Sequence, residues 1–427
     1  MTRPDLAGML MDARSLQPLL AEVLPALRGA APGSLRLHQV RRRVSRQTEQ
    51  AGAAWVSLAF APADPGQPGA DRLWCGVRAY GQDRARAAAA AGEGRHLPGL
   101  DAVAWSLVDD PALPQLRLLM RGDALPPGAA EAGWALAARE VMRYEPGSHV
   151  LLRLHLVRGL ARRTVWVKAF ADERWQHVAD HLARFAALAV RQPLAFRVAP
   201  PAGHCATRRS VWQDEVSGEP LLARLQADPE AAATALAAVA DGLARLQALP
   251  AWPAPPLGTG ELRQRAVKQA RKLLRAEAGL GPWVGPLLAA LADAPAEQAP
   301  VMVHGDCHAD QFLMQGRRLL VFDLDNLAQG QPAHDVADFA SQLLADERLA
   351  PATRRRLARR FIAEAWRALG PALRPAALAW HLRVLLLRKA YSQFVHQPPG
   401  WRSRCRRALR LAGLALARPD QAPERSS

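Results

Sequence analysis

The chain has 427 residues, half of them hydrophobic, and carries a formal net charge of +17. Its length allows a large core divided over two or three domains, and its hydrophobic content excludes an intrinsically disordered protein. The charge alone does not indicate a nucleic-acid partner. Of the 56 basic residues, 52 are Arg, scattered along the chain without an aromatic-interleaved stripe, so no nucleic acid is expected as the partner.

Other global features exclude several further classes. The four cysteines form no close pair, which argues against a disulfide framework or a zinc motif. The first residues contain no signal segment, and no run of 18 apolar residues occurs, so we expect a cytoplasmic protein without stable membrane association. A basic amphipathic helix over 402–418 could lie on a membrane surface, but its many alanines favour an ordinary terminal helix.

Residues 1–135 are predicted to form an N-terminal α/β region of unknown role. Leucines at helical spacing predict a helix over 1–30. The pattern is strand-like over 34–60, and a further strand is predicted over 72–80. Short helices are expected over 83–92 and 113–120. None of these segments carries recognisable chemistry, and a stretch rich in Pro, Gly and Ala at 124–132 predicts the first domain boundary.

The rest of the chain is predicted to form two lobes. A small lobe over 138–215 should hold a strand over 150–157 and another over 164–170. A lobe over 216–427 should be mostly helical and contain the catalytic loop. Periodicity and start signals predict one helix in the small lobe, over 172–188. In the large lobe they predict helices over 228–249, 260–279, 283–293, 335–346, 351–369 and 375–395.

Two acidic clusters are the most informative feature. The first lies in the loop His304–Gln311, and the second is Asp323-Leu324-Asp325. Short apolar strands and a turn through Gly316 separate them, a pattern that predicts a hairpin and brings both clusters to one end. Phosphoryl transfer requires such a set, because one carboxylate orients the attacking hydroxyl while others hold Mg²⁺.

These residues resemble the aminoglycoside phosphotransferase and choline kinase family, relatives of the protein kinases. The resemblance rests on His304-Gly305-Asp306, on Asp323 after a strand, and on Asp335-Val336-Ala337. It implies an α+β, bilobed protein-kinase-like fold with a small antiparallel β lobe and a mostly helical large lobe. It also implies ATP-dependent phosphorylation of a hydroxyl of a small molecule, such as a sugar, an amino alcohol or a related metabolite, with ATP and Mg²⁺ as cofactors.

The resemblance assigns roles at the catalytic loop. Asp306 would be the catalytic base, and Asp323 would bind Mg²⁺. Gln311 stands where the family has a metal-binding Asn, and its amide oxygen on one more methylene could still reach the metal. Asp325 is either a second metal ligand, if the strand continues past Asp323, or an acidic turn residue.

Three residues are expected to support this loop. His304 would pack beneath it, and Asp335 would either hold it or cap a helix. His308 would contact either the substrate or a neighbouring Asp. Cys307, within the loop, is expected to be a small buried side chain rather than a nucleophile.

The nucleotide site is implied in the small lobe. Lys168, in a chain with only four Lys, matches the family's ATP-contacting Lys. Its acidic partner would be Asp180, with Glu173 as the alternative. The segment after Ser210 resembles the inter-lobe hinge, whose backbone would bind the purine. Its four candidate residues are Gln213, Asp214, Glu215 and Val216.

Some alternatives stay open at this point. The turn at 145–149 is either a phosphate-covering loop or an ordinary hairpin turn. Because Gln311 departs from the family and no Gly-rich loop is present, a nucleotide-binding, pseudokinase-like module without turnover is the second hypothesis. A nucleic-acid-binding protein is the third. The sequence does not indicate the acceptor, the choice between ATP and GTP, or the oligomeric state.

Overall fold

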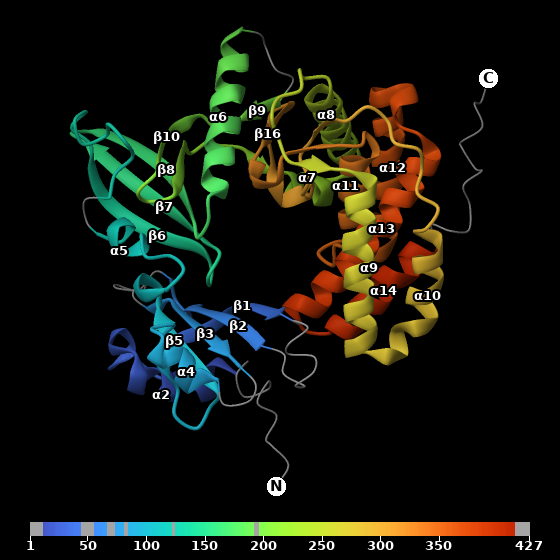
Figure 1. The fold of residues 1–427 in the computed structure, drawn as a ribbon. Coiled ribbons are helices and arrows are strands. Elements are labelled where there is room, and N and C mark those ends of the chain that lie inside the picture. The colour runs from blue at the N-terminus through green and yellow to red at the C-terminus, as the bar shows by residue number, and fades with distance from the viewer. Residues whose placement is uncertain are drawn as a thin grey trace. The chain divides into compact units, whose positions relative to one another are not determined.

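The computed structural model describes residues 12–43, 55–65, 73–80, 84–121, 124–191 and 196–414. The chain forms two compact units. The first contains residues 1–179, 200–215 and 395–397, and the second contains residues 180–199, 216–394 and 398–427. The fold is α+β, with antiparallel sheets in the first unit and mostly helices in the second, as predicted (Figure 1). No helix of the described ranges is both long and apolar enough to cross a bilayer.

The first sheet of the first unit has the strand order β1-β2-β3-β5-β4 and is antiparallel throughout. Its strands are β1 (Leu35–Arg43), β2 (Trp55–Pro62), β3 (Cys75–Ala79), β4 (Arg95–His96) and β5 (Ala102–Ser106). The helical segments around it are α2 (Ala13–Val23), η1 (Pro25–Leu27), α4 (Ala85–Ala90), η3 (Leu107–Asp109) and α5 (Leu116–Leu119).

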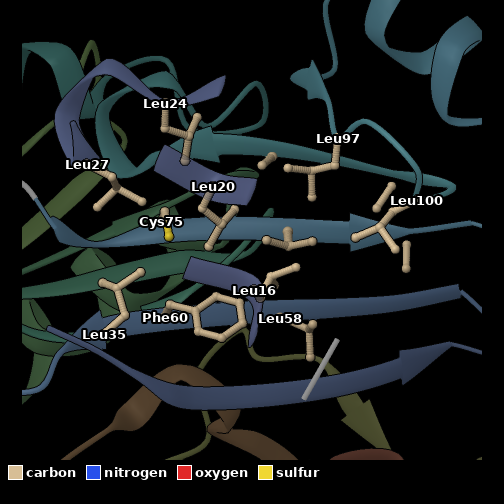
Figure 2. Packing of buried hydrophobic residues seen from close by; sticks show 14 of the residues in the cluster. Leu16, Leu20, Leu24, Leu27, Leu35, Leu58, Phe60, Cys75, Leu97 and Leu100 are labelled. Carbon is tan, nitrogen blue, oxygen red and sulfur yellow. The ribbon is translucent and has the colours of Figure 1, made fainter. Parts of the chain in front are cut away.

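Helix α2 covers one face of this sheet. Two of its three leucines, Leu16 and Leu20, are buried and belong to one cluster with Leu58 and Phe60 of β2 (Figure 2). Asp12 caps the helix by accepting the backbone N–H of Arg14, which supplies the N-terminal signal. The helix predicted over 1–30 is confirmed for 13–23 and is wrong beyond Val23, because Leu24 is extended and Pro25 starts the turn η1. Residues 1–11 lie outside the described residues.

The second sheet of the first unit has the order β10-β11-β8-β7-β6, again antiparallel. Its strands are β6 (Ala135–Glu145), β7 (His149–Arg158), β8 (Ala161–Phe170), β10 (Pro201–Cys205) and β11 (Ser210–Asp214). Side chains of the N-terminal region, among them Trp74 and Leu116, pack with Leu152 and Val167 of this sheet. The region before residue 135 therefore shares a core with the predicted small lobe.

The second unit is built from helices. Helices α8 and α12 pack against each other, as do α10 and α14 (Figure 1). Asp228 caps α8 through the N–H groups of Glu230 and Ala231, the start that Asp-Pro-Glu predicts. The helices are α7 (Leu221–Ala227), α8 (Pro229–Gln247), α9 (Thr259–Ala276), α10 (Gly281–Ala290), α11 (Ala333–Ala345), α12 (Pro351–Leu369), α13 (Pro375–His396) and α14 (Trp401–Leu414). Helix α6 (Arg174–Arg191) is divided between the two units.

The second unit also contains two small sheets and several single helical turns. One sheet has the order β12-β15-β16-β9, and the other has the order β13-β17-β14. The strands are β9 (Phe196–Val198), β12 (Glu219–Pro220), β13 (Pro256–Leu257), β14 (Val301–Val303), β15 (Phe312–Gln315), β16 (Arg318–Val321) and β17 (Ala328–Gly330). The turns are η4 (Ala278–Leu280), η5 (Ala309–Gln311), η6 (Leu324–Asn326) and η7 (Gly370–Ala372).

The predicted hairpin between the acidic clusters is confirmed. Strands β15 and β16 pair antiparallel from Phe312 opposite Val321 to Gln315 opposite Arg318. The two-residue connection starts with Gly316 at φ 62°, a backbone conformation that Gly adopts at little steric cost. The loop before β15 and the turn after β16 are thus held at one end of the same hairpin.

Candidate active site

The loop from His304 to Gln311 is held by two buried carboxylates of α11. Asp335 accepts the backbone N–H of His304 at 2.6 Å and that of Gly305 at 3.0 Å, and Asp338 accepts the N–H of Cys307 at 3.0 Å. Both carboxylates are almost fully buried. Asp335 is not the N-cap of α11, which is Pro332, so the hydrogen bonds follow the loop-holding alternative.

Burial shifts the ionisation of these supporting groups. Desolvation raises the pKa of Asp335, and it raises the pKa of Asp338 to about 6. Burial also raises the pKa of the Cys307 thiol well above its ordinary value, and the neighbouring carboxylates add to this effect. Cys307 is a buried, protonated thiol, as the sequence predicted, and not a nucleophile.

The pKa of Asp338 leads to a pH prediction. The Asp338 carboxyl binds its proton more tightly in the folded protein than in the unfolded chain, so protonation of Asp338 stabilises the fold. This stabilisation is complete below about pH 4 and is lost as the pH rises through 6. We expect the unfolding free energy of the wild type, relative to Asp338→Asn, to fall by about 3 kcal/mol from pH 4 to pH 7. Urea denaturation of both proteins at each pH measures this difference, and a constant difference would contradict the assignment.

The Asp306 side chain is partly exposed, and it is bound by Arg388, which the sequence analysis did not predict. Arg388 of α13 donates from Nη2 to Asp306 Oδ1 at 3.2 Å. The other carboxylate oxygen lies 3.9 Å from His308 Nε2. A guanidinium from a helix 82 residues further along the chain therefore fixes the orientation of the candidate base.

His308 and Asp310 belong to a second polar group beside Asp306. Arg348 binds Asp310 through both terminal nitrogens, at 2.7 and 2.9 Å, and also binds Asp346. A hydrogen bond with His308, followed by this ion pair, holds the pKa of Asp310 well below its usual range. His308 Nδ1 lies 3.6 Å from Asp310 Oδ2, in agreement with the expected contact with a neighbouring Asp. A contact of His308 with the substrate stays a prediction.

Gln311 and Asp323 are brought side by side. The Gln311 amide nitrogen donates to Asp323 Oδ2 at 3.2 Å and approaches His308 Nε2 at 3.0 Å. Rotating the Gln311 side-chain amide by half a turn would place its oxygen where its nitrogen now lies. A carboxylate and an amide oxygen are hard ligands that suit Mg²⁺, which fills its remaining positions with phosphate oxygens and water. The described residues contain no group of three or more His, Cys, Asp and Glu that could hold a metal.

The backbone around Asp323 differs from the expectation. Asp323 has φ 55° and ψ 61°, in the left-handed region, and begins the turn η6. The strand therefore does not continue to Asp325, and the premise that placed Asp325 on the same face as Asp323 is wrong. Asp is among the few residues that adopt this conformation, and such strain is often found at functional sites. The metal role of Asp325 itself stays a prediction.

His304 lies beneath the loop, completely buried. Its Nε2 donates to the carbonyl oxygen of Phe322 at 2.8 Å, which joins the catalytic loop to the strand that leads into Asp323. Its ring also packs near Phe312 of the hairpin. These contacts match the packing role expected of His304.

The residues predicted for the nucleotide lie mostly in the first unit. Lys168 lies on β8, opposite Leu151 of β7 and Val211 of β11, with its ammonium 5.6 Å from the ring of Phe170. Asp180 belongs to the second unit, so its pairing with Lys168 stays a prediction. The alternative partner, Glu173, accepts from the indole N–H of Trp175 and the side chain of Gln176, and pairs with Arg209.

The chain passes from the first unit to the second between Glu215 and Val216, within the segment predicted as the hinge. The N–H groups of Asp214 and Glu215 donate to the backbone carbonyls of Pro200 and Thr164. Their side chains pair with Arg163 and Arg153 respectively, and Gln213 lies on β11 opposite Trp166. The purine-binding role of Gln213, Asp214, Glu215 and Val216 is not tested by these contacts.

The turn at 145–149 is tied to the N-terminal region. Gly147 has φ 71°, and its N–H donates to Asp110 Oδ2 at 2.9 Å. Asp110, almost fully buried, also accepts the hydroxyl of Tyr144 at 2.7 Å. The Gly147 N–H that a phosphate-covering loop would offer is therefore already bound, which favours the ordinary hairpin turn.

Comparisons with known proteins match part of the chain to one family. The model of a family described as "Phosphotransferase enzyme family" matches residues 161–372. No curated protein matches the chain. Among solved structures, a thermostable mutant of an aminoglycoside phosphotransferase shares 14% identity with a TM-score of 0.48, covering 68% of this chain and 97% of its own.

Two further structures are similar to the chain at the same level. A macrolide 2'-phosphotransferase from Brachybacterium faecium has 18% identity and a TM-score of 0.44, covering 67% of this chain and 98% of its own. A choline/ethanolamine kinase family protein from Mesorhizobium loti has 14% identity and a TM-score of 0.44, covering 73% of this chain and 96% of its own. The family match, and not these distant likenesses, assigns the segment.

Proposed function

Because this chain belongs to the phosphotransferase enzyme family through residues 161–372, we propose that it transfers the γ-phosphoryl group of ATP to a hydroxyl of a small molecule. The observation that carries the proposal is the position of Asp306 on a loop held by Asp335 and Asp338, beside the paired side chains of Gln311 and Asp323. In that arrangement Asp306 would act as the base, and Gln311 and Asp323 would hold a cation at one end of the hairpin.

Asp306 would act mainly by orientation. The acceptor hydroxyl would donate a hydrogen bond to its free carboxylate oxygen, while Arg388 holds the other oxygen at 3.2 Å. The proton would pass to Asp306 as the hydroxyl oxygen bonds to the γ-phosphorus and the bond from that phosphorus to the ADP oxygen breaks. Asp323 and Gln311 would hold Mg²⁺, which would neutralise charge on the phosphates, and the family resemblance implies that Lys168 contacts the nucleotide.

The alternative of a nucleotide-binding module without turnover rests on Gln311 in place of the family's Asn. The position of Gln311, with its amide 3.2 Å from Asp323, supports the working enzyme, because the longer side chain reaches the carboxylate with which it would share a metal. Thermal unfolding with and without MgATP and MgGTP, followed by assay of ADP or GDP release with candidate acceptors, tests both hypotheses. Binding without phosphoryl transfer would favour the module.

The metal assignment gives a second prediction. Gln311→Leu removes one oxygen ligand at nearly constant volume, so we expect the Mg²⁺ concentration for half-maximal activity to rise at least tenfold. Asp323→Asn should raise it further, because a charged ligand is lost. The measurement is a Mg²⁺ titration of the rate at saturating ATP.

Gln315→Leu is the matched control, because Gln315 lies on the same hairpin with an exposed side chain. Its Mg²⁺ dependence should stay within twofold of the wild type. Equal Mg²⁺ titrations for Gln311→Leu and the wild type would remove Gln311 from the metal site.

A further inference from the structure

The segment that follows the first sheet, residues 107–119, contacts the second sheet of the first unit through two buried polar side chains. Asp110 follows the turn η3, and Gln115 immediately precedes α5. Their exposed fractions are 1% and 5%. Burying a carboxylate or an amide costs free energy unless its hydrogen bonds are made inside the protein. The partners of Asp110 and Gln115 therefore indicate what the N-terminal region holds in place.

Asp110 fixes the turn between β6 and β7. Its Oδ2 atom accepts the backbone N–H of Gly147 at 2.9 Å and the Tyr144 hydroxyl at 2.7 Å. Tyr144 itself accepts the indole N–H of Trp105, on β5, at 2.7 Å. Burial, and then the charge of Asp110, raises the pKa of Tyr144 well above its ordinary value, so its hydroxyl stays protonated and donates. The turn is thus tied to the first sheet by buried hydrogen bonds.

The end of β8 is bound by the same part of the chain. The backbone N–H of Ala171 donates to the carbonyl oxygen of Ser148, in the turn that Asp110 fixes, at 2.8 Å. Gln115 reaches the neighbouring residue directly, because its amide nitrogen donates to the carbonyl oxygen of Phe170 at 2.7 Å. The N-terminal region therefore holds two consecutive residues at the end of β8, one through the turn and the other through a side chain.

Lys168 lies two residues before Phe170 on the same strand. Because side chains alternate along a strand, Lys168 and Phe170 project from the same face of β8. The Lys168 ammonium lies 5.6 Å from the centre of the Phe170 ring, which is fully buried. A lysine has a compact charge on a flexible stem, so the position of its ammonium depends on the groups that pack against it. A shift of Phe170 would therefore displace the ammonium.

We propose that the N-terminal region is a positioning element for the nucleotide site, in which Asp110 and Gln115 fix the end of β8 and thereby hold Lys168 in place for the nucleotide phosphates. The inference rests on the proposed phosphotransferase function, which includes the contact of Lys168 with the nucleotide. The physical basis is preorganisation, because an ammonium that is already held loses less freedom when the phosphates bind. Asp110 and Gln115 act through β8 and are positioning residues, not catalytic ones.

Gln115→Met removes the donor to Phe170 and nearly keeps the side-chain volume. We expect it to raise the Kd for MgATP by about tenfold, because the end of β8 is no longer fixed. In a Lys168→Met background the same substitution should raise Kd by less than about twofold, because the residue through which it acts is already gone. Calorimetric titration of the wild type, both single variants and the double variant measures this. An unchanged Kd in Gln115→Met, or an equal effect in both backgrounds, would overturn the proposal.

The matched control is Gln17→Met on α2. Gln17 has the same exposed fraction as Gln115, 5%, and its amide nitrogen also donates to a backbone carbonyl oxygen, that of Ala31, at 2.7 Å. Its hydrogen-bond partners lie within residues 31–35, away from β8 in the chain. Gln17→Met should lower thermal stability at least as much as Gln115→Met and keep Kd for MgATP within about twofold of the wild type. An equal rise of Kd in both variants would indicate general destabilisation and overturn the proposal.

Hydrogen exchange of the wild type tests the proposal without any variant. The backbone N–H groups of Gly147 and Ala171 should already be protected without nucleotide, because the protein itself orders them. Ready exchange that becomes slow only when MgATP binds would show that the nucleotide orders the turn, and would overturn the proposal. Wild-type protein that binds no MgATP would overturn the proposed phosphotransferase function, whereas each contrary outcome above overturns the positioning role alone.

Discussion

Replacing Asp306 by Asn is expected to lower kcat by about 10²–10⁴-fold, because the amide cannot accept the hydroxyl proton. The side chain keeps its shape and can still accept the hydrogen bond that Arg388 donates at 3.2 Å, so the loop should stay in place. The affinity for MgATP should change less than threefold. Steady-state rates and nucleotide titrations of the purified variant measure the two effects separately.

The control for this variant is a carboxylate of the same loop. Asp310 is bound on both oxygens by Arg348, so Asp310→Asn should change kcat less than tenfold. A variant Asp306→Asn that keeps more than a tenth of the wild-type kcat would exclude Asp306 as the base. An equal loss of MgATP affinity would indicate that the residue holds the structure of the site instead.

Replacing Gly305 by Ala is expected to disrupt the catalytic loop. Gly305 has φ 78°, and a Cβ added there would lie 2.2 Å from the backbone carbonyl oxygen of Asn326. The neighbour is backbone, so the loop and the turn η6 must move apart. That movement displaces Asp306 relative to Asp323, and a misplacement of about an ångström can cost a hundredfold in rate. We also expect a loss of stability on the order of 3 kcal/mol.

Gly316→Ala separates backbone strain from the steric clash as causes of the loss in Gly305→Ala. Gly316 also has positive φ, at 62°, but nothing lies within 4 Å of the position its Cβ would take. It should lose about 1 kcal/mol from backbone strain alone and keep its activity. Urea denaturation and kcat of the two variants check the comparison. Similar losses in both would show that the close contact with Asn326 does not matter.

Much of the site was predictable because its parts are local in sequence. The loop with Asp306, the hairpin through Gly316 and the strand before Asp323 lie within about twenty residues, so spacing alone brings the two acidic clusters together. The buried support from Asp338 was also accessible in principle. It follows Asp335 by three residues on α11, and such a spacing puts both carboxylates on one helical face.

Distant partners were not predictable. Arg388 is one of 52 Arg, and no local pattern marks the one that reaches Asp306 from α13. The same holds for Arg348, which holds Asp310 and Asp346 together. No local pattern marks Asp110 either, although in the structure it accepts the N–H of Gly147 and the hydroxyl of Tyr144.

The sequence by itself determined most of the elements, the hairpin and the choice of the candidate catalytic loop, because these depend on short-range periodicity, turn residues and spacing. Only the tertiary structure decided that Asp323 takes a left-handed conformation after strand β16, and that the N-terminal region shares its core with the small lobe. It also decided that Asp310 pairs with Arg348 and that Glu347 pairs with Arg404. Those properties depend on contacts between segments tens of residues apart, and such contacts leave no periodic trace in the chain.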